Sequence, residues 1–567
     1  SSADNSTSLP PIPEEDEYID LDNTVEQHIS DSQQFYIDHS TKQRVDNYIE
    51  ETNMSGDKML AVSVMRNHYQ SMYDGLPAEY EAPLLLITGG PGVGKSFLVE
   101  VLDNASKMMR VGDQLRMALF GIAAINIDGA SLMAMMDIPT EFNRQGQQKV
   151  HPWKPDKLRQ FQNMYDTTKI SAIVIDEIST VKPYMLAYLN ARLQEACAST
   201  LPFGGKALVM LGDFDQLPPA GGPSLPELAM MIEKERRTGN RVFYNKKNFE
   251  ITSIVRQGAE LFKRAYHIKL TEQHRSEDEE HTNLLERMSN GETIGPEDLS
   301  VYKTISQNDT EFEFATILTP GNRDRHDYNN IQSQRWAHRH QTNIIRWPRR
   351  IRDKTWKGKP RDPRNVARAK EESSFWELFI PSALAYLTFN LNMMKGLANG
   401  LPVKYHSISF FEQEEQQQFE LLLNAAKPGE TITLEQPPDM INIEIFPDFP
   451  GDTKKERDKN KVRREQWKHG SIATDGRVVI PINVSSKKHV KWKTTQVRGG
   501  GSRPGLPNFH PSKVELADFF PIEPGFSITI HKAQVSQITL TKNAIKYTIF
   551  SPSQKLLFSH SSLRDEQ

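Results

Sequence analysis

An eight-residue run rich in glycine carries the clearest chemical signal in this sequence. The run GGPGVGKS has the spacing G-x-x-x-x-G-K-[ST]. Glycines let the backbone curl until successive N–H groups point at phosphate oxygens, and a helix that starts directly afterwards adds its positive end. The lysine can reach the β- and γ-phosphates, and the neighbouring hydroxyl can ligate Mg²⁺. The pattern predicts a nucleotide-binding loop made of Gly89, Gly90, Pro91, Gly92, Val93, Gly94, Lys95 and Ser96.

Two adjacent carboxylates end a second apolar run, AIVI, about 80 residues after the loop. The carboxyl end of a parallel strand lies at the edge of the sheet where α/β folds bind ligands. We expect Asp176 to hold the Mg²⁺ shell and Glu177 to polarise the attacking water. The alternative is an ordinary solvated strand end.

A third apolar run, LVMLGD, is followed by Gln216. A glutamine amide can donate to a γ-phosphate and accept from a water, so Gln216 can report whether the phosphate bond is intact. The alternative is a turn glutamine fixed by Pro218 and Pro219.

The elements that position these residues are unbroken apolar strands. The runs at 84–88, 172–177 and 208–213 do not alternate with polar residues, which indicates burial on both faces and a parallel sheet covered by helices. The predicted fold class is therefore α/β. A second α/β lobe is expected to open near 269–276 and to return at 520–534, with short β-like runs between them.

The predicted domains follow from these patterns and from composition. A disordered acidic tail (1–35) precedes a first lobe with the phosphate loop (36–250). The remaining predicted segments are the first part of a second lobe (251–330), a basic insert and return to the core (331–399), an inserted β-rich module (400–515) and the last part of the second lobe with an atypical end (516–567).

Bulk composition excludes several classes of protein. The formal net charge is −4, so a nucleic-acid surface must be a local patch. Cys197 is the only cysteine, which excludes an internal disulfide and suits a reducing compartment. We interpret it as a buried residue and not as a reactive thiol. No stretch approaches the roughly 20 apolar residues of a membrane span, so we expect no membrane partner and an intracellular location, in the nucleus or a mitochondrion.

Taken together, the motifs resemble those of the Pif-type (petite integration frequency) DNA helicases, RecD-like members of superfamily 1 that include Helitron-type helicases. Eight motifs stand in the family's order, namely GGPGVGKS, GIAAINIDGAS, IVIDEIS, LGDFDQLPP, LTEQHRS, LTPGN, GLANG and ITIHKAQ. The resemblance covers roughly residues 55–535. It implies two RecA-like lobes and a motor that hydrolyses ATP with Mg²⁺ while moving 5′→3′ on single-stranded DNA. It also implies action on DNA junctions and roles in DNA repair, recombination and telomere maintenance.

The resemblance assigns roles to matching positions. The catalytic set is Lys95, Glu177, Gln216 as γ-phosphate sensor, and Arg275 as an arginine supplied by the second lobe. Ser96 and Asp176 are the implied metal ligands. The implied DNA-binding set is Ser131, Thr529, His531, Lys532 and Gln534.

The sequence departs from the family pattern at three places. Lys58 stands where the family has an adenine-reading glutamine, and Met133 replaces the histidine of a Thr-x-His contact. The terminal arginine motif is absent, with Arg564 the only candidate in the tail. A degenerate, nucleic-acid-binding remnant of a mobile-element helicase therefore stays open as the alternative function, whereas a small-molecule kinase does not account for the TIHKAQ run.

A basic stretch at 331–370 interleaves arginines and lysines with three tryptophans. Positive charge gathers phosphates and aromatic faces stack bases, so the stretch is a candidate DNA surface. Two alternatives stay open: a solvated charge run, or tryptophans that anchor the insert to the core.

Overall fold

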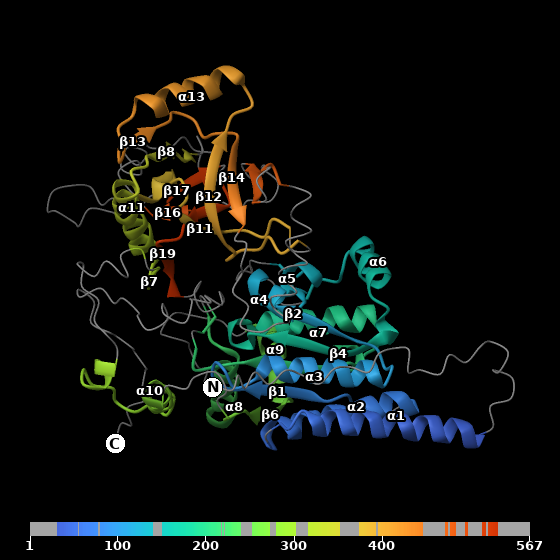
Figure 1. Cartoon of the computed structure of the whole chain (residues 1–567). Coiled ribbons are helices and arrows are strands. Elements are labelled where there is room, and N and C mark those ends of the chain that lie inside the picture. Colours follow the sequence, from blue (N-terminus) through green and yellow to red (C-terminus); the bar gives the residue numbers. More distant parts are fainter. Residues whose placement is uncertain are drawn as a thin grey trace, which may run out of the picture. The chain divides into compact units, whose positions relative to one another are not determined.

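The computed structural model of the chain consists of two units, each described by itself: unit 1, Ser1–Ile294, and unit 2, Gly295–Gln567 (Figure 1). The residues that the structure describes are 31–54, 56–76, 80–139, 150–216, 218–219, 222–239, 252–272, 279–301, 314, 316–351, 373–392, 395–445, 471–473, 477–483, 494–496, 513–517 and 520–530.

Unit 1 is built on a six-stranded sheet whose paired strands all run parallel. The strand order is β3-β2-β4-β5-β1-β6. The strands are β1 (Leu84–Thr88), β2 (Asp113–Ala118), β3 (Ala130–Ser131), β4 (Ile170–Asp176), β5 (Ala207–Gly212) and β6 (Tyr266–Lys269).

Each central strand buries both of its faces. In β5, Leu208 and Met210 pack into one apolar core while Val209 and Leu211 pack into another, and the alternate residues of β4 divide in the same way. Helices α1 (Asp31–Glu51), α2 (Gly56–Asp74) and α3 (Lys95–Met108) cover one face of the sheet. The other face is covered by α6 (Pro155–Met164), α7 (Pro183–Ala196), α8 (Leu225–Thr238) and α9 (Ser253–Lys263), and the short helices α4 (Gly121–Asn126) and α5 (Leu132–Met135) follow β2 and β3. The unbroken apolar runs follow from this two-sided burial.

The second lobe begins later than the sequence predicted. The expected boundary was 250/251, but β6 pairs with β1 in the sheet of unit 1. Helix α9 packs so closely on α7 that a Cβ on Gly258 would lie 1.8 Å from the carbonyl oxygen of Pro183. Helix α10 (Glu279–Ser289) also belongs to unit 1, which ends at Ile294.

Unit 2 combines helices with mostly antiparallel strands. Its helices are α11 (Asn322–Arg339) and α13 (Gln413–Ala425). A five-stranded antiparallel sheet has the order β15-β14-β12-β11-β18, and β7 and β19 form a separate parallel pair. The strands are β7 (Ile317–Thr319), β8 (Ile344–Pro348), β9 (Arg350–Ile351), β10 (Trp376–Phe379), β11 (Leu384–Leu387), β12 (Pro402–Ser409), β13 (Thr431–Thr433), β14 (Met440–Ile445), β15 (Val478–Asn483), β16 (Thr494–Gln496), β17 (Lys513–Ala517), β18 (Ile522–Pro524) and β19 (Ser527–Thr529).

The predicted fold class is confirmed: a parallel-sheet α/β core with additional antiparallel modules. The five-stranded sheet extends beyond the predicted bounds of the β-rich module, because β11 and β18 lie outside 400–515 yet pair within it. Among the helices in the described part of the chain, none has the length and apolar composition to cross a membrane.

Part of the basic stretch is core and not surface. The Trp347 side chain is 1 % exposed and donates through Nε1 to Glu377 Oε2 at 2.7 Å. Arg349 is also buried, and its guanidinium lies 3.6 Å from Glu523. The Arg346 guanidinium lies over the Trp376 ring, 4.4 Å from its centroid. These contacts bear out the anchoring interpretation for 346–349, whereas residues 352–370 lie outside the described part of the chain.

Candidate functional site

The glycine-rich loop connects the carboxyl end of β1 to the first turn of α3. Gly94 caps the helix in the left-handed region at φ 86°, which a side chain rarely adopts, and no side chain caps the helix start. Gly92 is also left-handed, at φ 89°. The backbone thus leaves the helix N-terminus open, as a phosphate-binding turn requires.

The Lys95 ammonium closes the loop on itself. Its Nζ donates to the carbonyl oxygens of Gly89 at 2.6 Å and Gly90 at 2.9 Å.

Strand order brings the three predicted motifs to one edge of the sheet. β5 lies between β1 and β4, and the Gly89 N–H donates to the carbonyl oxygen of Gly212 at 3.2 Å. Gly212 also faces the turn after β4: a Cβ there would lie 2.9 Å from Ile178 Cγ2 and 3.0 Å from its amide nitrogen. A larger residue at this position would require Ile178 to shift.

The two carboxylates lie at the end of β4 and in the strained turn that follows it, and both residues are half-buried. Glu177 adopts φ 54°, an uncommon conformation for this residue, and its carbonyl oxygen accepts from the Thr180 hydroxyl at 2.7 Å. Its backbone N–H donates to Asp176 Oδ1 at 2.9 Å. Within the described residues, Glu177 Oε2 is buried without a hydrogen-bond partner. Such strain and an unsatisfied buried oxygen are typical of functional sites.

The pKa values of these carboxylates reveal a shared electrostatic environment. Burial raises the pKa of Asp176, which the Glu177 N–H and the Lys95 ammonium partly offset. Burial and the Asp176 carboxylate raise the pKa of Glu177 to about 7, which Lys95 opposes and Asp213 reinforces. Lys95, Asp176 and Asp213 are thus close enough to the Glu177 carboxylate to act on its pKa.

Gln216 is held beside this group by Asp213. Its Nε2 donates to Asp213 Oδ2 at 3.2 Å, and the Asp215 N–H donates to Asp213 Oδ1 at 3.0 Å. Asp213 is 7 % exposed. The apolar pattern placed Asp213 only at the end of a predicted strand, although Asp often accepts a hydrogen bond from the backbone two residues on, as it does here from Asp215.

The other predicted site residues are placed in part. Ser96 is exposed on the first turn of α3. Ser131 ends β3 and is 6 % exposed, so little of it is available to a ligand. Thr529 ends β19 in unit 2 and is partly exposed. Arg275, His531, Lys532 and Gln534 lie outside the described residues.

Lys58 is buried on the first turn of α2, and its Nζ lies 3.5 Å from Glu272 Oε2. The neighbouring Thr271 hydroxyl donates to Asp57 Oδ2 at 3.0 Å. The lysine that departs from the family pattern therefore ties α2 to the segment after β6.

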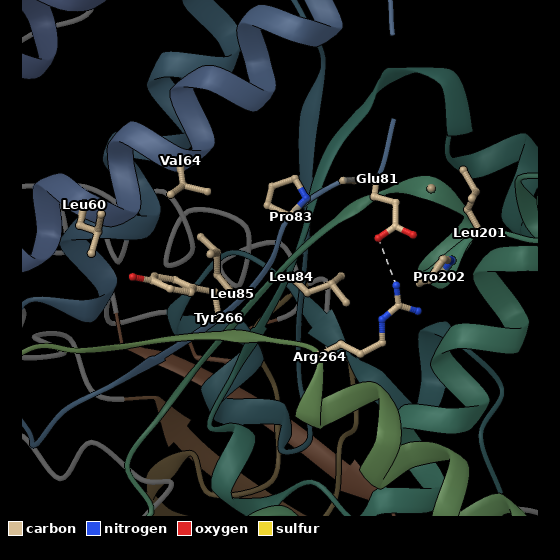
Figure 2. Close-up of a pocket in the computed structure, with 12 residues that line it drawn as sticks. Leu60, Val64, Glu81, Pro83, Leu84, Leu85, Leu201, Pro202, Arg264 and Tyr266 are labelled. Carbon is tan, nitrogen blue, oxygen red and sulfur yellow. Dashed lines mark hydrogen bonds and ion pairs between the residues drawn. The ribbon is translucent and has the colours of Figure 1, made fainter. Parts of the chain in front are cut away.

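A cavity of about 410 Å³ lies at the opposite edge of the unit 1 sheet (Figure 2). Leu84 and Tyr266, which line it, are the first residues of β1 and β6, whereas the phosphate loop follows the last residue of β1. Arg264 and Glu81 form an ion pair on its wall, with Arg264 Nη2 3.2 Å from Glu81 Oε2. The cavity is therefore separate from the candidate nucleotide site.

The site's chemistry fits Mg²⁺ held together with phosphates. Within the described residues, no three His, Cys, Asp or Glu side chains form a cluster that could hold a metal ion alone. Mg²⁺ typically takes only one or two protein ligands and completes its shell with phosphate oxygens and water. A hydroxyl from Ser96 and a carboxylate from Asp176 match that pattern.

Comparison with known proteins gives a family match over part of the chain. Residues 66–298 match the model of the PIF1-like helicase family. This segment contains every site residue described above in unit 1 except Lys58 and Asp57.

Individual sequence relatives match over shorter segments of the chain. The chain is 30 % identical over 138 residues to the ATP-dependent DNA helicase Pif1 of Bdellovibrio bacteriovorus, covering 24 % of this chain and 29 % of that protein. It is 28 % identical over 216 residues to Pif1 of Campylobacter jejuni, covering 33 % of this chain and 43 % of the relative. A solved structure of Bacteroides Pif1 bound to single-stranded DNA is 19 % identical, with 82 % of this chain and 83 % of that chain covered and a TM-score of 0.46. The matched segments thus span less than half the length of these two sequence relatives.

Proposed function

Because residues 66–298 of this chain belong to the PIF1-like helicase family, we propose that the chain is an ATP-dependent DNA helicase. One observation carries the proposal beyond the family match. Lys95, Asp176 and Asp213 lie close enough to Glu177 to act on its pKa, and Asp213 accepts a hydrogen bond from Gln216. This is a constellation for cleaving a phosphoanhydride bond with water.

Each side chain has a distinct task in hydrolysis. The Lys95 ammonium leaves the carbonyl oxygens of Gly89 and Gly90 and binds the β- and γ-phosphates, where it stabilises the charge that develops on the transferred group. Glu177 accepts a proton from the attacking water, whose oxygen forms a bond to the γ-phosphorus as the bond to ADP breaks. The Gln216 amide donates to the γ-phosphate and orients that water. Arg275 is proposed to supply a second positive charge.

Ser96 and Asp176 would hold Mg²⁺, which neutralises phosphate charge when bound. The open N-terminus of α3 would then bind phosphate oxygens through its backbone N–H groups. ATP–Mg²⁺ is therefore the proposed substrate form.

Single-stranded DNA is the proposed track, with translocation in the 5′→3′ direction and unwinding at junctions. Thr529, His531, Lys532 and Gln534 in unit 2 are the proposed contacts, together with the small exposed part of Ser131 in unit 1. Roles in repair, recombination and telomere maintenance, and a nuclear or mitochondrial location, remain predictions.

The deciding experiment measures steady-state ATP hydrolysis with and without single-stranded DNA, and strand separation on a forked duplex. Lys95→Ala should abolish hydrolysis, because it removes the only lysine of the phosphate loop. Lys107→Ala is the matched control, since Lys107 lies on the same helix but is half exposed and pairs with Asp103. Equal hydrolysis by the two variants would refute the assignment of the site.

One alternative is favoured by a sequence observation. Residues 535–567 do not match the arginine motif that follows this position in the family, a departure that fits a helicase-derived DNA-binding domain with weak ATP turnover. Such a protein would bind single-stranded DNA with normal affinity yet show no DNA-stimulated hydrolysis, so the same assay separates the two functions.

A further inference from the structure

The buried face of α11 is polar. Its buried residues include Arg325, Asn329, Gln332 and Ser333, whose spacing places them along one side of the helix. Polar side chains are costly to bury unless they are hydrogen-bonded. Hydrogen bonds, and not apolar contact alone, therefore fix what this helix packs against.

Asn329 makes a two-way contact with the backbone of β19. Its Nδ2 donates to the carbonyl oxygen of Ser527 at 3.1 Å, and its Oδ1 accepts from the Ser527 N–H at 2.7 Å. Asn329 is 3 % exposed and Ser527 is fully buried. The amide thus satisfies the donor and the acceptor that a neighbouring strand would otherwise pair with.

The other edge of β19 is paired with β7. The Ile317 N–H donates to the carbonyl oxygen of Phe526 at 2.8 Å, and the two strands run parallel. Figure 1 shows α11 alongside β7 and β19. The short strand therefore lies between a strand on one edge and a single asparagine on the other.

An ion-pair network fixes the chain just before β19. Arg325, one turn before Asn329, pairs with Glu523 of β18, and Arg349 Nη2 lies 3.6 Å from the same carboxylate. All of residues 520–528 are buried. The first partly exposed residue is Thr529, two positions after the residue that Asn329 holds, and this is where the proposed DNA contacts begin.

We infer that Asn329 is a positioning residue for DNA binding: it sets the register and direction of β19, and so places Thr529, the partly exposed residue proposed to contact DNA. The inference rests on the proposed function. Without this asparagine, β19 would stay paired with β7 but lose both hydrogen bonds between Asn329 and Ser527. The buried N–H and carbonyl oxygen of Ser527 would then lack these partners.

The test compares Asn329→Leu with Asn442→Leu in the full chain. Asn442 is the matched control, because it is 2 % exposed in the same unit but bonds to the hydroxyls of Ser407 and Ser409, away from β19. Fluorescence anisotropy gives the affinity for a labelled single strand, and ATP hydrolysis against DNA concentration gives kcat and the apparent KM for DNA. Hydrogen exchange is followed on a peptide that spans β18 and β19.

We expect Asn329→Leu to weaken DNA binding and to raise the KM for DNA by about tenfold, while kcat at saturating DNA and the KM for ATP stay within about twofold. Exchange in the β18–β19 peptide should accelerate in this variant and not in Asn442→Leu. If Asn329→Leu does not fold, Asn329→Asp, which keeps the acceptor for the Ser527 N–H but loses the donor, is compared with Asn442→Asp and should show the same pattern more weakly. If Asn329→Leu and Asn442→Leu bind DNA with equal affinity, the inference about Asn329 is wrong and the proposed function is unaffected. A wild-type chain that binds no single strand would overturn the proposed function and this inference with it.

Discussion

The stability of unit 1 should depend on pH through one buried histidine. His68, on α2, is 2 % exposed. Its Nε2 lies 3.3 Å from the Ser171 carbonyl oxygen, which can only accept, so Nε2 carries the proton and Nδ1 accepts from the Tyr80 hydroxyl at 2.9 Å. Both ring nitrogens are therefore satisfied by the neutral imidazole.

Burial lowers the pKa of His68 from 6.5 to about 4, opposed by its bond to Ser171 and assisted by the Lys206 ammonium. The unfolded chain consequently binds a proton at a higher pH than the folded chain does. The contribution of the neutral His68 to the free energy of unfolding is fully present above about pH 6.5. It falls as the pH drops towards 4, below which His68 is protonated in both the folded and the unfolded state. The difference between the two pKa values corresponds to about 3 kcal/mol over this window.

The assay is urea unfolding between pH 7.5 and 4.5, followed by the fluorescence of Trp153, with the tryptophans of unit 2 replaced by phenylalanine where folding permits. His68→Gln stays neutral at every pH, so it should lose less stability than the wild type on acidification. His267→Gln is the control, because His267 is exposed on β6 and bonds to the Thr88 hydroxyl. Stability curves of wild type and His68→Gln that stay parallel across the window would refute the reasoning.

Three further predictions concern the site and the DNA surface. Glu177→Gln should keep ATP affinity but lower kcat by about 10²–10⁴-fold, measured by single-turnover hydrolysis, because it removes the base and leaves Asp176 in place; a wild-type rate would mean that another group accepts the proton. Gly212→Ala should lower kcat for ATP hydrolysis clearly and the unfolding midpoint only slightly, because the added Cβ would press on Ile178 next to the carboxylates. An unchanged kcat would show that the turn can adjust to the added methyl group. Replacing Lys354, Lys357 and Lys359 by serine should reduce the slope of log affinity for single-stranded DNA against log salt by up to about 2, and an unchanged slope would return the stretch to a solvated loop.

The chain's end offers one more test. The described residues and the sequence supply Lys95 and the proposed Arg275, but no second arginine motif. We expect a second such charge to raise the rate of hydrolysis further, because each one typically contributes orders of magnitude to the rate. Grafting a relative's terminal motif after Gln534 should raise steady-state hydrolysis, and brisk turnover by the unmodified chain would show that another residue fills the role.

The phosphate loop and its sheet could be predicted from sequence because both obey local rules. A loop that must curl around phosphates needs glycines at fixed places, and Gly92 and Gly94 do adopt left-handed angles. A strand buried on both faces must be apolar throughout, which identified β1, β4 and β5. The edge at which Lys95 and Asp176 meet followed from the direction of those strands.

Other features depended on partners far away in the sequence. β6 pairs with β1, and unit 1 extends to Ile294 and not to the predicted residue 250. No local sequence pattern indicates which sheet a four-residue strand joins. Arg349 looked like part of a DNA surface until its carboxylate partner at Glu523 was seen. The role inferred for Asn329 likewise exists only because the tertiary fold brings Ser527, 198 residues away, to its side chain. The sequence by itself therefore determined the residues that we propose contact the nucleotide, since their geometry is set by the backbone within a few positions. Only the tertiary structure decided which polar residues are buried supports, because a buried charge or amide is defined by the distant group that satisfies it.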